Sequence, residues 1–206
     1  YSVNSTSGFS VIAYTGNATA GATIPHGLGV APDMIWVKNT QTAEAWACYF
    51  KPLGNTKVLT LNDTNAELTQ AQWNNTSPTS TLFSVGSGGN TNLSQTHVAY
   101  CFANKKGYSK VGSYEGNGNA DAAFCYTGFT PAYVMLKNAN ASQSWQIYTW
   151  DMQPFNEFCT TDAGRLKADL TEIASTKNAM DMLSNGFKIR TSAGDINTSG
   201  QTVIYA

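Results

Sequence analysis

The chain has 206 residues, a formal net charge of −1 and only 12% charged side chains, against 42% hydrophobic ones. This balance allows a full core for one large or two small β domains. The net charge is close to zero and the largest basic cluster is Lys105–Lys106, which argues against nucleic acid and anionic membranes as partners. No apolar run approaches the ~18 residues of a membrane-spanning helix, so membrane insertion is not expected. Polarity comes instead from Asn, Ser, Thr and Gly, which are typical of turns and strand surfaces, so the composition predicts an all-β fold.

Short strands separated by turn sequences are predicted along the first half of the chain. Turn-forming strings rich in Gly and Pro, such as "PHGLGVAP" and "GSGGN", lie between them. This spacing is typical of hairpins in an antiparallel sheet. The predicted strands are Phe9–Tyr14, Met34–Asn39, Ala45–Phe50, Lys57–Asn62, Thr81–Val85 and His97–Phe102.

The second half follows the same pattern, with one exception. A hairpin is predicted at "SNG", before Phe187, because Asn-Gly readily supplies the positive φ angles of tight hairpin turns. The string "AGRLKADLTEIASTKNAMDML" has partial helical spacing at Leu166, Leu170 and Ile173, which predicts one short helix. The strands predicted in this half are Lys110–Tyr114, Tyr133–Asn138, Trp145–Trp150, Phe187–Thr191 and Thr202–Tyr205.

One passage is written twice. "YTGNATAGATIPHGLGVAPDMIWVKN" begins at Tyr14, and "YEGNGNADAAFCYTGFTPAYVMLKN" begins at Tyr114. Further matches pair Phe83 with Phe187, Asn92 with Asn197, Val98 with Val203 and Tyr100 with Tyr205. Two copies, spanning about 8–102 and 107–206, indicate a duplication and not a solenoid, which requires at least three shorter repeats.

The link between the copies bears on the number of domains. Only "ANKKG" separates the last strand of the first copy from the first strand of the second, and this is the length of a hairpin connection. We therefore predict a single β-sandwich domain over residues 1–206, jelly-roll or lectin-like, built from two duplicated halves. Two tandem small β-sandwiches are the alternative.

Catalytic residues are not predicted, so the chain is not expected to be an enzyme. His26 aligns with Cys125 in the second copy, whereas a duplicated site would keep its general base. His97 lies inside a predicted strand, and a structural role is favoured for both histidines. No G-x-S-x-G nucleophile motif occurs, and no close pair of carboxylates recurs between the copies.

Metals and cofactors are not predicted either. The four cysteines (Cys48, Cys101, Cys125 and Cys159) show no C-x-x-C spacing, and buried free thiols are favoured over disulfides. The string "GDINTSG" resembles a calcium loop only weakly, because Asp195 is its one carboxylate.

Aromatic residues suggest a carbohydrate ligand, because flat rings pack on the C–H faces of sugars. Trp73 and Trp150 have no counterpart in the other copy, and as loop aromatics they are the better contact candidates. Trp46 and Trp145 occupy equivalent places in the two copies, so they are either two equivalent sites or, as favoured, two core anchors.

The motifs together resemble a known domain of tailed phages. The strings are "GFSVIAYTGN", "HGLGVAPDMIWVKN", "VAYCFANKKGYSKVGSYEGNG", "YTGFTPAYVMLKN" and "MLSNGFKIR", in this order. They are similar to a domain of uncharacterised function in tail-fibre and other virion structural proteins of tailed, often marine, phages. The resemblance covers Gly8 to Ala206.

The resemblance implies a place on the virion surface, in a tail fibre, an appendage or a capsid decoration. Its expected partners are other virion proteins and further copies of itself, as a homo-oligomer, with host-surface glycans as the candidate ligand for host attachment. The resemblance supplies no catalytic residue. The alternatives are a carbohydrate-binding module or lectin and, second, a polysaccharide depolymerase.

Overall fold

A computed structural model of the chain describes residues 1–152, 164–171 and 179–206. The regular structure in these ranges consists of sixteen β-strands, two four-residue α-helices and three short 3-10 turns. Every strand pairing within them is antiparallel. The prediction of an all-β fold is confirmed.

The chain divides into two compact units. Unit 1 comprises Tyr1–Leu61 and Glu67–Lys105, and unit 2 comprises Asn62–Ala66 and Lys106–Ala206. The division after Lys105 lies inside the "ANKKG" link between the two copies of the repeat. That residues 1–206 fold as a single domain stays a prediction, and each unit is described by itself.

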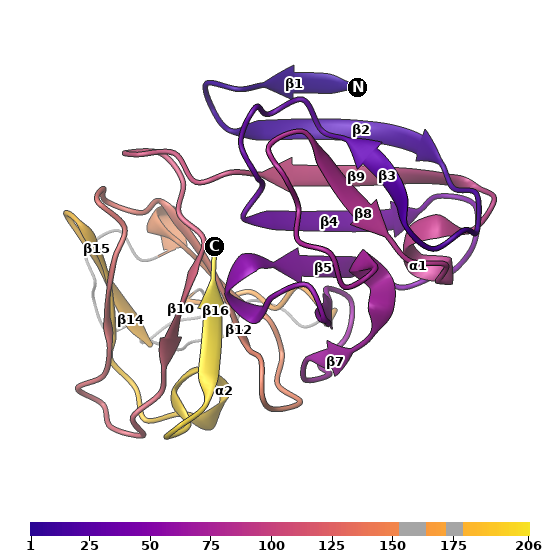
Figure 1. Cartoon of the computed structure of the whole chain (residues 1–206). Helices are drawn as coiled ribbons and strands as arrows, with labels where there is room; N and C mark the ends of the chain where they lie inside the picture. Colours follow the sequence, from indigo (N-terminus) through magenta and orange to yellow (C-terminus); the bar gives the residue numbers. More distant parts are fainter. Residues whose placement is uncertain (153–163, 172–178) are drawn as a thin grey trace. The chain divides into compact units, whose positions relative to one another are not determined.

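Unit 1 contains a seven-stranded sheet and a two-stranded sheet (Figure 1). The strand order of the large sheet is β1-β2-β9-β4-β5-β6-β7, and β3 pairs with β8 in the small one. The large sheet is formed by β1 (Ser2–Asn4), β2 (Phe9–Thr15), β4 (Met34–Asn39), β5 (Ala47–Phe50), β6 (Lys57–Thr60), β7 (Leu68–Thr69) and β9 (Thr96–Phe102). The small sheet is formed by β3 (Ala22–Pro25) and β8 (Leu82–Val85).

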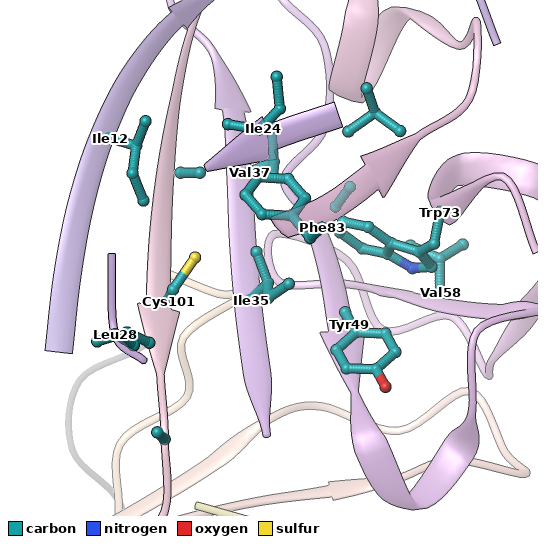
Figure 2. Packing of buried hydrophobic residues seen from close by; sticks show 14 residues of the cluster. Ile12, Ile24, Leu28, Ile35, Val37, Tyr49, Val58, Trp73, Phe83 and Cys101 are labelled. Atoms are coloured by element: carbon teal, nitrogen blue, oxygen red, sulfur yellow. The ribbon is translucent and has the colours of Figure 1, made fainter. Parts of the chain in front are cut away.

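The two sheets of unit 1 share one core. Buried residues alternate with more exposed ones along β2 and β9, as expected for a sheet with one face packed against a core. Ile35 and Val37 of β4 lie in one cluster with Phe83 of β8 and with Trp73 from the 3-10 turn η2 (Ala71–Trp73), as Figure 2 shows. Side chains from two sheets that meet in one core make unit 1 a β-sandwich.

Unit 2 also has two sheets. The strand order is β10-β16-β12-β13 in the larger sheet and β11-β15-β14 in the smaller one. The larger sheet is formed by β10 (Gly112–Glu115), β12 (Tyr133–Asn138), β13 (Gln146–Thr149) and β16 (Thr202–Tyr205), the smaller one by β11 (Phe124–Tyr126), β14 (Met180–Leu183) and β15 (Gly186–Ile189). Residues of both sheets, including Tyr148 of β13 and Phe187 of β15, form one buried cluster.

The two units repeat one topology. The order β2-β9-β4-β5 of unit 1 corresponds to β10-β16-β12-β13 of unit 2, and the pair β3-β8 corresponds to β11-β15. The short helices α1 (Gly89–Asn92) and α2 (Gly194–Asn197) stand at equivalent places, before the last strand of each copy. The sequence duplication is therefore a duplication of the fold.

The helix predicted from Leu166, Leu170 and Ile173 is wrong for the described part of that stretch. Leu166 forms an isolated β-bridge with Ile147, and Met180–Leu183 forms β14. In β14, side chains alternate between core and solvent with period two, and pairing with β15 selects that period over the helical one. Ile173 lies outside the described residues.

The hairpin predicted at "SNG" is confirmed, but for a different reason. Leu183 pairs with Gly186, so Ser184 and Asn185 form the two-residue turn. Neither Asn185 nor Gly186 has a positive φ. Glycine is needed at 186 because a Cβ atom there would lie 2.1 Å from the Cys125 carbonyl oxygen of the neighbouring strand.

In the last strand of each copy, the strand register differs by one residue from the match predicted from sequence. Tyr14 lies opposite His97 in unit 1, and Tyr114 lies opposite Val203 in unit 2. Val203 is thus the counterpart of His97, and Tyr205 that of Ala99, so the predicted matches of Val98 with Val203 and of Tyr100 with Tyr205 are wrong. The turn before the last strand is one residue longer in the second copy and includes Gly200, with φ +73°.

Candidate functional site

The residues kept in both copies meet at the start of the last turn of each unit. In unit 1, the buried side chain of Asn92 accepts a hydrogen bond from Asn17 N at 3.0 Å. Its amide nitrogen donates to Thr19 O at 2.9 Å and to Gly86 O at 2.6 Å. Asn92 therefore ties three backbone segments together.

Unit 2 contains the same clamp, built on Asn197. The Asn197 side chain accepts from Asn117 N at 2.9 Å and donates to Asn119 O and Thr191 O, each at 2.7 Å. An unpaired buried amide costs about 1–3 kcal/mol, so these bonds hold the local fold. Because the scaffold uses these polar atoms, they are not free to bind a ligand.

The tyrosine and glycine of the repeated "YxGN" string serve the same turn. The hydroxyl group of Tyr14 donates to Thr91 O at 2.5 Å, and that of Tyr114 donates to Ile196 O at 2.7 Å. Burial raises the pKa of both tyrosines, which keeps the hydroxyls protonated as donors.

A side chain at either glycine of this string would collide with the backbone. A Cβ atom on Gly16 would lie 1.9 Å from Leu93 O, and one on Gly116 would lie 2.2 Å from Thr198 O. The tyrosine, glycine and asparagine of the repeated passage thus maintain the same turn in both units.

His26 completes a turn in the core of unit 1. Its Nδ1 atom accepts a hydrogen bond from Leu28 N at 3.2 Å, so Nε2 carries the proton and donates to Thr79 O at 3.1 Å. Burial lowers the pKa of His26, in keeping with a neutral ring. Both ring nitrogens have partners, and the structural role predicted for His26 is confirmed.

The counterpart of His26 in unit 2 is Thr127 and not Cys125. The strand register makes Cys125 the counterpart of Ile24, which moves the match by two residues. The Thr127 hydroxyl accepts from Phe129 N, two residues further on, at 3.4 Å, as the His26 ring does in its own turn. A hydroxyl group can replace the imidazole because the task is to hold a turn.

His97 is buried as well. Its Nδ1 atom lies 3.0 Å from Gln95 O, and its ring stacks on that of Tyr14 with centroids 5.2 Å apart. Val203 stands at the equivalent place in unit 2. The structural role predicted for His97 is confirmed too.

Five carboxylates of the described residues are each paired with one cation. The pairs are Lys51–Asp33, Lys57–Glu67, Arg165–Asp195, Lys188–Asp121 and Arg190–Asp181. Within the described ranges, no group of three or more His, Cys, Asp or Glu residues could hold a metal ion. The Asp195 carboxylate pairs with Arg165. We therefore assign a structural role to the "GDINTSG" string, in place of its weak resemblance to a calcium loop.

Three of the cysteines are free and buried, as predicted: Cys48, Cys101 and Cys125. Burial raises the pKa of both Cys101 and Cys125 to about 12. At neutral pH these thiols are protonated, so they pack as small apolar groups. Cys159 lies outside the described residues.

Of the four predicted contact tryptophans, Trp73 and Trp145 are buried. Trp73 is 1% exposed, its Nε1 donates to Lys57 O at 3.0 Å, and its ring meets Tyr49 edge-on (Figure 2). The polar string "QWNNTSP" suggested an exposed loop, but the 3-10 turn η2 directs the indole into the core, where a sugar cannot stack on it. Trp145 is also 1% exposed, which fits the core-anchor alternative.

Trp46 and Trp150 keep accessible surface. Trp46 is half-buried against Tyr100, with ring centroids 6.1 Å apart. Trp150, at the start of the 3-10 turn η3 (Trp150–Met152), is 38% exposed. Ligand binding by these two residues stays a prediction.

Two more exposed aromatic residues went unnoticed in the sequence. Phe124 and Tyr126 lie on β11 and are 46% and 65% exposed. Between them, Cys125 points into the core of unit 2. The alternation in "FCY" is the signal that could have identified this short strand and its outward-facing rings.

Unit 2 also buries a lysine. Lys137 Nζ donates to Thr64 O at 3.1 Å, Asn138 O at 2.9 Å and Ala141 O at 3.3 Å. Burial lowers its pKa to about 8, although the carboxylates of Asp169 and Asp63 oppose this shift. Its three donors have three carbonyl partners, so Lys137 fastens residues 62–66 within unit 2.

The fold and these sites define an all-β protein built from a duplicated sandwich unit. The chain belongs to the family described as Domain of unknown function (DUF7483), whose model matches residues 1–206. No curated protein and no solved structure matches the chain. Over the described residues, no helix is long and apolar enough to cross a membrane.

Proposed function

We propose that the chain is a non-enzymatic structural protein of the surface of a tailed-phage particle, in a tail fibre, an appendage or a capsid decoration. One observation carries the contact role. The residues that the duplication preserves, above all Asn92 and Asn197, spend their polar atoms on the backbone of their own unit. The polar residues common to both copies therefore hold the backbone of each unit in the same arrangement. The placement on a phage particle comes from the resemblance of the ordered sequence motifs.

The histidines support a role in contact over a role in catalysis. Both rings are buried and hold turns or strands, and their counterparts in the other unit are Thr127 and Val203. General acid–base catalysis needs a titratable group within reach of a substrate. Neither His26 nor His97 meets that condition.

Other virion proteins and further copies of the chain are the proposed partners, with host-surface glycans as the ligand. A nearly neutral surface suits assembly in several copies, because it produces little mutual repulsion. The exposed rings of Trp150, Phe124 and Tyr126 and the half-buried ring of Trp46 have surface available for contact. The lectin alternative draws on the same rings, without the particle.

Immunogold labelling tests the particle role. Antibodies against the purified chain are applied to purified particles of a tailed phage that encodes it, and labelling at regular positions on the tail or head is expected. Antibody absorbed with the purified chain is the control. Particles that carry no label, and whose mass spectra lack the chain's peptides, would contradict the proposal.

A depolymerase would be recognised by its products. The purified chain is incubated with capsular polysaccharide from the host of that phage, and reducing ends are measured over time. We expect no increase above a heat-denatured control. A steady release of reducing ends would replace the structural proposal with the enzymatic one.

A further inference from the structure

The outer face of the β11-β15-β14 sheet in unit 2 carries two exposed aromatic rings. Strand alternation places Phe124 and Tyr126 on this face, while Cys125 between them faces the core. On the next strand, Lys188 lies opposite Phe124 and Gly186 lies opposite Tyr126. Phe124, Tyr126, Gly186 and Lys188 together form what we call the β11 platform.

Glycines let both rings lie close to the backbone. A Cβ atom on Gly186 would lie 3.1 Å from Phe124 Cζ, so this ring leans over the glycine. A Cβ atom on Gly128 would lie 3.5 Å from the Tyr126 hydroxyl, so the second ring lies against the following loop. Each ring is therefore supported by main chain and still open to solvent.

The turn and the loop beside the platform are bonded to each other. Asn185 O, in the β14-β15 turn, accepts from Thr127 N at 3.0 Å and from Gly128 N at 3.1 Å. The Thr130 hydroxyl donates to Ser184 O at 3.2 Å. A surface held in this way loses little conformational entropy when a ligand binds.

Charged groups stand beside the rings. Lys188 Nζ lies 2.5 Å from Asp121 Oδ1, and Arg190 Nε lies 2.8 Å from Asp181 Oδ2. Asp181 is the cross-strand neighbour of Lys188 in β14, and the Asp121 carboxylate is largely exposed. An apolar ring surface with donors and acceptors at its edge matches a sugar, which has C–H faces and a rim of hydroxyl groups.

The equivalent face of unit 1 lacks these features. By strand register, Thr23 stands in the place of Phe124 and Pro25 in the place of Tyr126. The counterparts of Gly186 and Lys188 are Leu82 and Ser84. The two copies share the scaffold, whereas the exposed rings on this face occur only in the second copy.

The size of the face limits what can occupy it. Three strands of three or four residues, at ~3.4 Å per residue and ~4.8 Å between strands, cover roughly 200 Å². A stable protein interface buries about 800 Å² on each partner. This face alone is smaller than a stable protein interface, and its area suits one or two sugar rings.

We propose that the β11 platform is a saccharide-binding site, in which pyranose rings stack on Phe124 and Tyr126. The hydroxyl groups of the sugar are bound by the Lys188–Asp121 and Arg190–Asp181 pairs. The inference rests on the proposed function for its biological setting, since it names the site and the ligand class of a surface protein that contacts host glycans.

Nuclear magnetic resonance on the full, isotopically labelled chain tests the site directly. The probes are cellobiose, lactose, maltose and N,N′-diacetylchitobiose, each titrated separately. We expect saturable shifts of the Phe124, Tyr126, Gly186 and Lys188 signals with at least one disaccharide. Two substitutions, Tyr126→Ala and Phe124→Thr, should each weaken that affinity roughly tenfold. The second introduces the residue that unit 1 has at the equivalent position.

Tyr108→Ala is the matched control, because Tyr108 is 67% exposed and Tyr126 is 65% exposed. It should leave the affinity unchanged. Shifts centred elsewhere, or no shift with any of the four probes, would overturn the inference. The mapping uses the unaltered chain, so it decides even if a variant fails to fold. Particle labelling is independent of this outcome. If the chain is found on particles but binds none of the sugars, only the proposed saccharide site is contradicted. If the chain binds a sugar but is absent from particles, only the particle role is contradicted.

Discussion

Asn197 Oδ1 accepts a hydrogen bond from Asn117 N at 2.9 Å, across eighty positions of sequence. Unit 1 repeats this bond at 3.0 Å with a different pair of asparagines. A polar contact kept in both copies, amid loops that differ in sequence and length, indicates that the turn depends on it. The duplication preserved an internal framework, and the outer surface was free to change.

Replacing Asn92 by Ala should destabilise the chain by about 3 kcal/mol. The change removes the side-chain partners of Asn17 N, Thr19 O and Gly86 O, and buried groups without partners carry the main cost. Chemical denaturation followed by tryptophan fluorescence measures the loss. Asn55→Ala is the control, since Asn55 makes one exposed hydrogen bond to Ser77. Equal stability of the two variants would show that the clamp is dispensable.

Comparing the unfolding of the Asn92→Ala and Asn197→Ala variants shows how many cooperative units the chain has. Unit 2 contains residues 62–66 as well as 106–206, so neither unit is an uninterrupted stretch of sequence. We expect one unfolding transition, which either substitution shifts as a whole. Calorimetry provides the check. Two transitions, each sensitive to only one of the substitutions, would favour the alternative of two tandem sandwiches.

Long strands could be predicted from sequence because their own residues define them. Met34–Asn39 and Tyr133–Asn138 have the predicted bounds, and apolar side chains recur along each. The strands β3 and β11 were missed. They have only four and three residues, and each depends on a partner about sixty residues away, which local patterns cannot reveal.

The site was harder to predict than the fold. Trp73 sits among polar neighbours in sequence, and only the turn that carries it shows that its ring enters the core. The match of His26 with Cys125 failed because a one- or two-residue shift between copies changes which residue faces which partner. Strand register, which depends on three-dimensional pairing, identifies Thr127 instead.

His26 should make the stability of the chain fall in mild acid. Burial lowers its folded-state pKa below the ordinary value of 6.5, so the unfolded chain takes up the proton first as the pH falls. The free energy of unfolding should therefore decrease below about pH 6.5, by at most about 1.4 kcal/mol per pH unit. His26→Thr, which introduces the residue of the unit 2 turn, should lack this component. Parallel stability curves for the two proteins would contradict the assignment.

Lys137 should act in the alkaline range and with the same sign as His26. Its folded-state pKa is about 8 against an ordinary 10.5, so between these values the unfolded chain holds a proton that the folded chain has lost. Stability should rise with pH across this window relative to Lys137→Met, which has no titrating group there. Denaturation at a series of pH values measures the difference. Lys110→Met, at an exposed position, should follow the unaltered chain, and a Lys137→Met curve that does the same would refute the effect.

The buried thiols should resist modification until the chain unfolds. With a pKa of about 12, Cys101 and Cys125 hold roughly a thousandth of the thiolate of an ordinary cysteine, and thiolate is the reactive form. The experiment uses Cys159→Ser, so that only the three buried thiols are counted. A chromogenic disulfide reagent should react very slowly with the native protein and with all three thiols in denaturant. Rapid reaction of the native protein, located by peptide mass spectrometry, would mean that the core of that unit opens more readily than its packing implies.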